Sequence, residues 1–104
     1  MMNFSKKLQE SLDLLRQLEA LLNEEGESNW IRGVRAAINV GESSRGENVT
    51  EEAAFKEMAA TYRSICGGAG SFSDYFIWRE DFDERQEANK IFVQITNQLW
   101  KLLG

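Results

Sequence analysis

The sequence contains no proline and no histidine, and it has a single cysteine. Without proline, no residue removes a backbone donor from a helix interior, so uninterrupted helices are favoured. Without histidine, the chain lacks the commonest general base, the commonest metal ligand and the base of Ser-His and Cys-His pairs. One cysteine excludes an internal disulfide. This fits a reducing compartment, and we expect a cytoplasmic protein.

Charge and hydropathy argue against two further classes of protein. The 12 basic and 17 acidic residues give a net charge of −5, unlike a dedicated nucleic-acid binder, which must neutralise phosphates. The longest apolar runs are a few residues, far short of the roughly 20 that span a bilayer. The N-terminus has no apolar stretch of a secretory signal. We therefore expect neither a nucleic-acid nor a membrane partner, and a basic protein partner is favoured.

The length of 104 residues predicts one domain that covers residues 1–104. Apolar residues make up 42% of the chain, which suffices for a core without disulfides or metals. Intrinsic disorder is therefore not expected.

Apolar residues at steps of three and four predict four amphipathic helices. The first begins near Phe4 and ends before Gly26. The second starts with Ser28 or Asn29 as its N-cap and stops at Gly41. The residues expected to face the core in these two helices are Phe4, Leu8, Leu12, Leu15, Leu18, Leu21, Leu22, Trp30, Ile31, Val34, Ala37 and Ile38.

The third helix follows a capping box formed by Asn48 and Glu51 and ends before residue 67. The last begins near Asp81 or Phe82 and runs for about 22 residues, with acids in its first turn as the helix dipole prefers. The expected core residues are Phe55, Met58, Ala59, Tyr62, Ile65 and Cys66 in the third helix, and Ala88, Ile91, Phe92, Ile95, Leu99, Leu102 and Leu103 in the last. The Cys66 thiol is expected to be buried and inert.

None of these helices can bury its apolar stripe alone, so the sequence predicts an all-α fold. We expect a compact four-helix bundle-like domain with an irregular aromatic-rich segment before the last helix.

A glycine-rich turn precedes that aromatic segment. It contains no lysine and follows a helix, whereas phosphate-binding loops follow a strand, and a Walker A loop also ends in Gly-Lys-Ser or Gly-Lys-Thr. A helix-terminating turn is therefore favoured over an anion-binding nest. The residues assigned to this structural turn are Gly67, Gly68, Gly70, Ser71 and Asp74.

The acids at the start of the last helix allow two interpretations. Glu80, Glu84 and Glu87 share a helical face, and Glu10 and Asp13 lie on the first helix, so a metal-dependent hydrolase of nucleotides or phosphoesters remains an alternative. A solvated acidic helix start explains the same residues without a metal. We expect no metal and no other cofactor.

The aromatic residues beside these acids favour a binding surface. Tyr75, Phe76, Ile77 and Trp78 are consecutive residues of a short element and cannot all point inward, so one or two of the rings are expected at the surface. Exposed aromatic rings next to acids are typical of interaction sites. The residues predicted to bind a partner are Tyr75, Trp78, Asp81, Asp83, Glu84 and Glu87.

The turn Gly67-Gly68-Ala69-Gly70-Ser71-Phe72-Ser73-Asp74, together with Trp30 at the start of the second helix, resembles a family of small, uncharacterised bacterial helical proteins. The family turn reads Gly-Gly-x-Gly-Ser-Phe/Leu-Asn-Asp, and this chain has Ser73 where asparagine is usual. The resemblance covers residues 28–103. It implies structural roles for the turn residues and for Trp30, implies no established enzymatic activity, and associates some members with toxin immunity.

The function predicted from the sequence is therefore that of a non-catalytic bacterial partner-binding protein, such as an immunity protein that neutralises a basic toxin. A homodimer through the first helix is also possible, because Leu14 and Leu22 broaden its apolar face.

Overall fold

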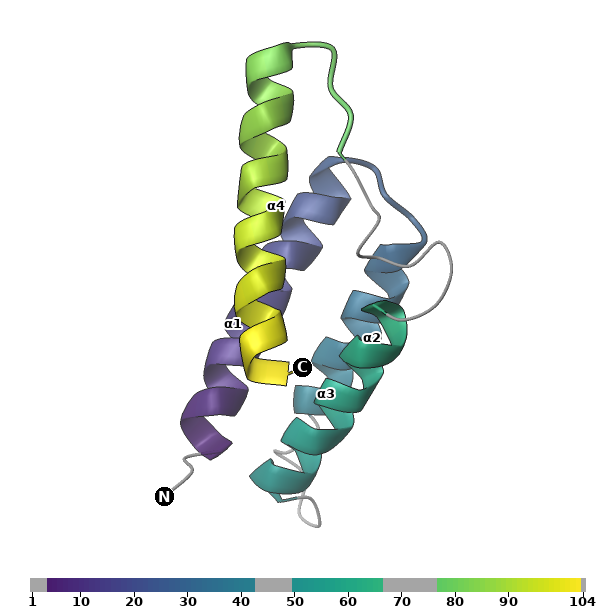
Figure 1. Cartoon of the computed structure of the whole chain (residues 1–104). Helices are drawn as coiled ribbons and strands as arrows, with labels where there is room; N and C mark the ends of the chain where they lie inside the picture. Colours follow the sequence, from purple (N-terminus) through teal and green to yellow (C-terminus); the bar gives the residue numbers. More distant parts are fainter. Residues whose placement is uncertain (1–3, 43–49, 67–76, 104) are drawn as a thin grey trace.

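The computed structural model describes residues 4–42, 50–66 and 77–103. These residues form four helices, which are α1 (Phe4–Glu24), α2 (Trp30–Glu42), α3 (Glu51–Cys66) and α4 (Phe82–Leu103). Consecutive helices run in opposite directions (Figure 1). Helix α1 packs against the other three helices, and α3 also contacts α2 and α4. The described residues contain no strand, so the predicted all-α four-helix fold is confirmed.

One hydrophobic core joins the helices. The predicted stripes of all four helices contribute to it, with Leu15, Val34, Met58 and Leu99 fully buried. Ile91 is an exception at 39% exposed, because it lies roughly 80° around α4 from the centre of the buried stripe. Over the part of the chain described, no helix combines the length and the apolar character that crossing a bilayer requires.

The starts of α2 and α3 are capped by residues other than those expected. The Glu27 carboxylate accepts hydrogen bonds from the backbone N–H groups of Asn29 at 3.0 Å and Ile31 at 3.2 Å, and also from that of Trp30. Glu27 is therefore the capping residue of α2, in place of the predicted Ser28 or Asn29. A glutamate that precedes the helix can act as a cap because its long side chain reaches forward to the free N–H groups of the first turn. At α3, Thr50 Oγ1 accepts from the Ala53 N–H at 3.0 Å, whereas the expected cap, residue 48, lies outside the described residues.

The end of α1 matches the prediction. Gly26 has a φ of 69°, its N–H donates to the Asn23 carbonyl at 3.1 Å, and the Glu27 N–H donates to the Leu22 carbonyl at 3.0 Å. This pair of hydrogen bonds is a Schellman motif, which needs a left-handed residue at this position. The turn brings Glu27 into place to cap α2.

Replacing Gly26 by alanine should lower the free energy of unfolding by about 1 kcal/mol, because a Cβ disfavours a positive φ. A Cβ at this position would meet no atom within 4 Å, so the loss isolates the backbone conformation. Urea denaturation measures it. Gly26→Asn is the matched control and should lose less, because asparagine tolerates the left-handed region better than alanine; equal losses would contradict the assignment.

Ser11 is a polar residue inside the core. Its side chain is fully buried on α1, and its Oγ has no hydrogen-bond partner among the described residues. A buried hydroxyl without a partner carries an uncompensated desolvation cost.

Ser11→Ala should therefore raise the free energy of unfolding by about 1 kcal/mol, since it removes that cost and alanine favours the helix. Thermal and urea denaturation give the change. Ser64→Ala serves as the control, because the exposed Ser64 hydroxyl donates to the Thr61 carbonyl at 2.7 Å. An S11A protein no more stable than the parent would show that the Ser11 hydroxyl has a hydrogen-bond partner in solution, and would contradict the predicted desolvation cost.

Candidate binding surface

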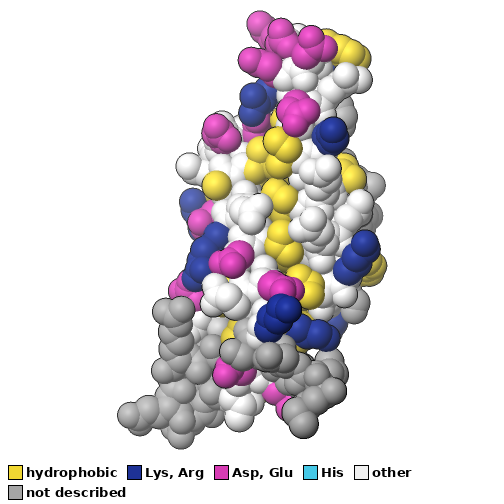
Figure 2. All heavy atoms as spheres, turned by 90° about the vertical axis from the view of Figure 1, so that its left-hand side faces the viewer, with side chains coloured by type: hydrophobic (Ala, Val, Ile, Leu, Met, Phe, Trp, Pro, Cys, Tyr) yellow, Lys and Arg dark blue, Asp and Glu magenta, His cyan; other side chains and the backbone are white. Residues whose placement is uncertain are grey.

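The N-terminal turns of α4 extend beyond the ends of the other helices (Figure 1). Side chains of Asp and Glu gather on this projecting end, and hydrophobic side chains lie beside them (Figure 2). We call it the acidic-aromatic end. It consists of the exposed residues Trp78, Glu80, Asp81, Phe82, Asp83, Glu84 and Glu87.

Asp81 determines where α4 begins. Its Oδ1 accepts a hydrogen bond from the Glu84 N–H at 2.9 Å, and its carbonyl accepts from the Arg85 N–H at 3.0 Å. Asp81 is therefore the N-cap of α4. Asp83 and Glu84 in the first turn add negative charge next to the positive end of the helix dipole. The local sequence thus explains why several acids are found at this end.

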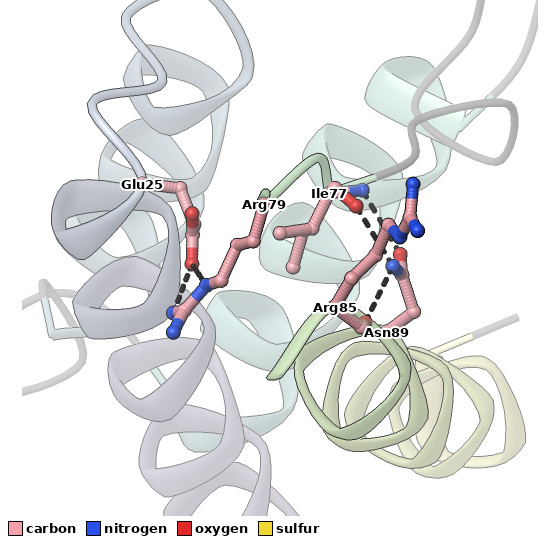
Figure 3. Close-up of polar contacts among 5 residues, drawn as sticks. All are labelled: Glu25, Ile77, Arg79, Arg85 and Asn89. Atoms are coloured by element: carbon pink, nitrogen blue, oxygen red, sulfur yellow. Dashed lines mark hydrogen bonds and ion pairs between the residues drawn. The ribbon is translucent and has the colours of Figure 1, made fainter. Parts of the chain in front are cut away.

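The backbone just before α4 is held by Asn89. The Ile77 N–H donates to Asn89 Oδ1 at 2.9 Å, and Asn89 Nδ2 donates to the Ile77 carbonyl at 2.8 Å and to the Arg85 carbonyl at 2.9 Å (Figure 3). The side chain of Ile77 is 1% exposed and belongs to the core. Residue 77 is therefore fixed by both its backbone and its side chain.

An ion pair connects the same segment to the end of α1. Arg79 Nε donates to Glu25 Oε1 at 2.7 Å, and Arg79 Nη2 contacts the same oxygen (Figure 3). This hydrogen bond raises the pKa of Arg79, and the charges of Glu25, Glu84 and Glu24 act in the same direction, whereas burial opposes them. Because Glu25 is largely buried, the pair is less exposed to solvent than an ordinary surface pair.

The hydrogen bonds of Ile77 with Asn89 and the ion pair of Arg79 with Glu25 place Trp78 at the surface. The Ile77 side chain lies in the core and the partly exposed Arg79 side chain turns towards Glu25, and Trp78 between them is 68% exposed. The Arg85 guanidinium carbon lies 4.2 Å from the centre of the Trp78 ring and 5.3 Å from that of Phe82, which is itself 58% exposed. Such distances allow cation–π attraction, so Arg85 restrains both rings without covering them.

The structure brings together the predicted residues that it describes. Trp78, Asp81, Asp83, Glu84 and Glu87 all lie exposed on the acidic-aromatic end. The remaining predicted residues, which are Tyr75 and the turn residues Gly67, Gly68, Gly70, Ser71 and Asp74, lie outside the described residues.

Sequence reasoning missed the residues that position the surface. Glu25 and Arg79 are 54 positions apart, and no local pattern pairs them. Asn89 is a polar residue between the core positions Ala88 and Phe92 of α4. A polar residue at such a position is the one sign in the sequence that its side chain binds neighbouring backbone. The sequence pattern marks Phe82 as a helix start and gives no sign that its ring is part of this surface.

The described acids are not arranged as a metal site. Among residues 4–42, 50–66 and 77–103, no group of three or more Asp, Glu, Cys or His side chains could hold a metal ion. Glu10 and Asp13 are instead engaged on α1 with Lys6 and Arg16.

The fold and surface define a four-helix all-α domain with an exposed acidic-aromatic end. The chain belongs to the family described as a domain of unknown function, DUF6966, whose model matches residues 23–83, more than half of the chain. No curated protein and no solved structure matches the chain.

Removing the Asn89 amide should destabilise the segment before α4. In Asn89→Ala the Ile77 N–H and carbonyl lose their described side-chain partner, so we expect a loss of about 2 kcal/mol in the free energy of unfolding and faster hydrogen exchange at the Ile77 amide. Asn97→Ala, at an exposed position on the same helix, is the control and should change stability by less than about 0.5 kcal/mol. Unchanged exchange at Ile77 in N89A would contradict this role of Asn89.

Proposed function

We propose that the protein is a non-catalytic bacterial binding protein that recognises a basic protein through its acidic-aromatic end. In this proposal it acts as an immunity protein, and the partner is a basic toxin. The observation that carries the proposal is the exposure of Trp78 and Phe82, at 68% and 58%, among five exposed acids.

The two rings have the properties of binding anchors. Large aromatic side chains supply much of the affinity of protein interfaces, and anchors that are already ordered lose less entropy on binding. Trp78 is restrained by the attachments of Ile77 and Arg79 and by the stacked Arg85. A partner can therefore bury Trp78 and Phe82 without first ordering them.

The surrounding acids supply the charge that selects the partner. Arg79 is already paired with Glu25, and Arg85 lies over the two rings. The five carboxylates thus dominate the outer surface of this end. A patch of one sign accelerates encounter with a partner of the opposite sign and repels partners of the same sign. A basic partner fits this distribution.

Among residues 4–42, 50–66 and 77–103, no group of carboxylates favours the hydrolase alternative. Such an enzyme would need carboxylates that converge on one metal ion. Glu80, Glu84 and Glu87 are instead all exposed to solvent.

The test compares what wild type and a charge-reversed variant retain from a lysate of the source bacterium. Asp83→Lys/Glu87→Lys reverses two carboxylates and leaves the Asp81 cap in place. We expect wild type to retain a basic protein at low salt. The variant should bind that protein at least about tenfold more slowly, and its association rate should depend less on salt.

Glu51→Lys/Glu57→Lys is the matched control, since it reverses one first-turn acid and one mid-helix acid on α3, both exposed. It should retain the same protein at the wild-type rate. The proposal fails if both double variants slow association equally, or if the proteins that wild type retains are acidic.

A further inference from the structure

Helix α4 carries a strip of exposed apolar side chains outside the core. Phe82, Val93 and Trp100 are 58%, 50% and 54% exposed. At about 100° per residue they fall within roughly 20° of one another, and at 1.5 Å per residue they span about 27 Å along the helix. These three residues are the α4 strip. Three large apolar side chains are thus exposed on one face of α4, with the polar residues Gln86 and Asn89 between Phe82 and Val93.

The charges beside the α4 strip identify the occupant. Asp83 lies at its N-terminal end and Lys101 at its C-terminal end, and helical spacing puts both on the same flank of the strip. Neither forms an ion pair with any residue that the structure describes. One flank of the strip therefore carries an acidic residue near its N-terminal end and a basic residue near its C-terminal end, and the exposed Lys90 lies between them on the same flank.

We infer that the α4 strip binds the α4 strip of a second copy of this chain, with the two helices antiparallel. A twofold axis near residue 91 places Phe82 opposite Trp100 of the second copy and Val93 close to the axis. It also places Asp83 beside Lys101 of the second copy, and the symmetry makes this pair twice. A parallel arrangement would instead put Asp83 level with Asp83 of the second copy, on the opposite flank, so neither Asp83 nor Lys101 would meet an opposite charge.

Space on α4 is available for such a helix. An open hollow of about 1050 Å³ lies along the face of α4 between Phe82 and Gln94, and it is lined by Phe82, Asn89, Lys90 and Val93 among others. A second helix laid on the strip would fill part of this hollow. Its apolar residues would meet Val93 and Phe82.

Two other surfaces fit a second copy less well. The sequence suggested α1, but Leu22 is fully buried in the core and Leu14 is half-buried. A smaller groove between α1 and α4 is lined by Leu14 and Leu102, but its acids Glu10 and Asp13 already face Lys6 and Arg16. Among the surfaces formed by the described residues, the α4 strip is the one that combines strongly exposed apolar side chains with an unpaired acid and an unpaired base at its ends.

This inference goes beyond the proposed function and stands apart from it. The two surfaces share Phe82 and Asp83, so a basic partner and a second copy would compete. Val93 and Trp100 lie outside the acidic-aromatic end. Changes there therefore test self-association while leaving the proposed partner surface intact.

Sedimentation equilibrium on the full chain, over about a hundredfold range of concentration, tests the inference. Wild type should form a dimer. Val93→Gln and Trp100→Ala should each weaken the dimer at least tenfold. Ile91→Gln is the matched control, because it changes another exposed apolar residue of α4 on a different face, and it should leave the dissociation constant unchanged.

A charge swap tests the antiparallel arrangement. Asp83→Lys and Lys101→Asp should each weaken the dimer several-fold, and the double variant D83K/K101D should restore it to within about threefold of wild type. Circular dichroism confirms that each variant is folded. A wild-type chain that stays monomeric, a double variant no tighter than the single ones, or an I91Q variant as weak as V93Q would each overturn the inference.

Discussion

The surface described here depends on how the backbone at Ile77 is held. Its side chain lies in the core, and Asn89 satisfies both of its backbone polar groups. With residue 77 fixed inward and Arg79 tied to Glu25, the residue between them must face solvent. The exposure of Trp78 is thus a consequence of the fold rather than an isolated feature. The entry of the chain into α4 at Asp81 follows from the same attachments.

The helices could be predicted from the sequence because each carries a regular apolar stripe. The stripe from Leu8 to Leu22 and the acids before α4 gave bounds close to those observed. The caps were harder to predict, because Glu27 reaches α2 from outside the usual cap position. Ile91 was predicted to be buried and is exposed. The spacing of apolar residues shows which side of α4 faces the core, but it does not show how much of the helix circumference the other helices cover.

The exposed residues of the candidate surface could be predicted from the sequence, but the contacts that hold them in place could not. Four consecutive apolar residues that cannot all face inward predicted an exposed ring, and Trp78 is exposed. The pairing of Glu25 with Arg79 depends on how the end of α1 meets the segment before α4, which no local pattern encodes. The family match from 23 to 83 includes both of these residues and ends at the second residue of α4.

We propose that a basic partner binds the acidic-aromatic end, and cross-linking from this end tests the proposal. A photoreactive amino acid in place of Gln86, an exposed residue one turn after Phe82, leaves both rings intact, and the same group in place of Ile91 on another face of α4 is the control. Irradiation of both proteins in the source organism tests the proposal most directly. We expect an adduct with a basic protein other than the chain itself from position 86, and little of it from position 91. Equal amounts of that adduct from both positions, or none from position 86, would contradict the proposal.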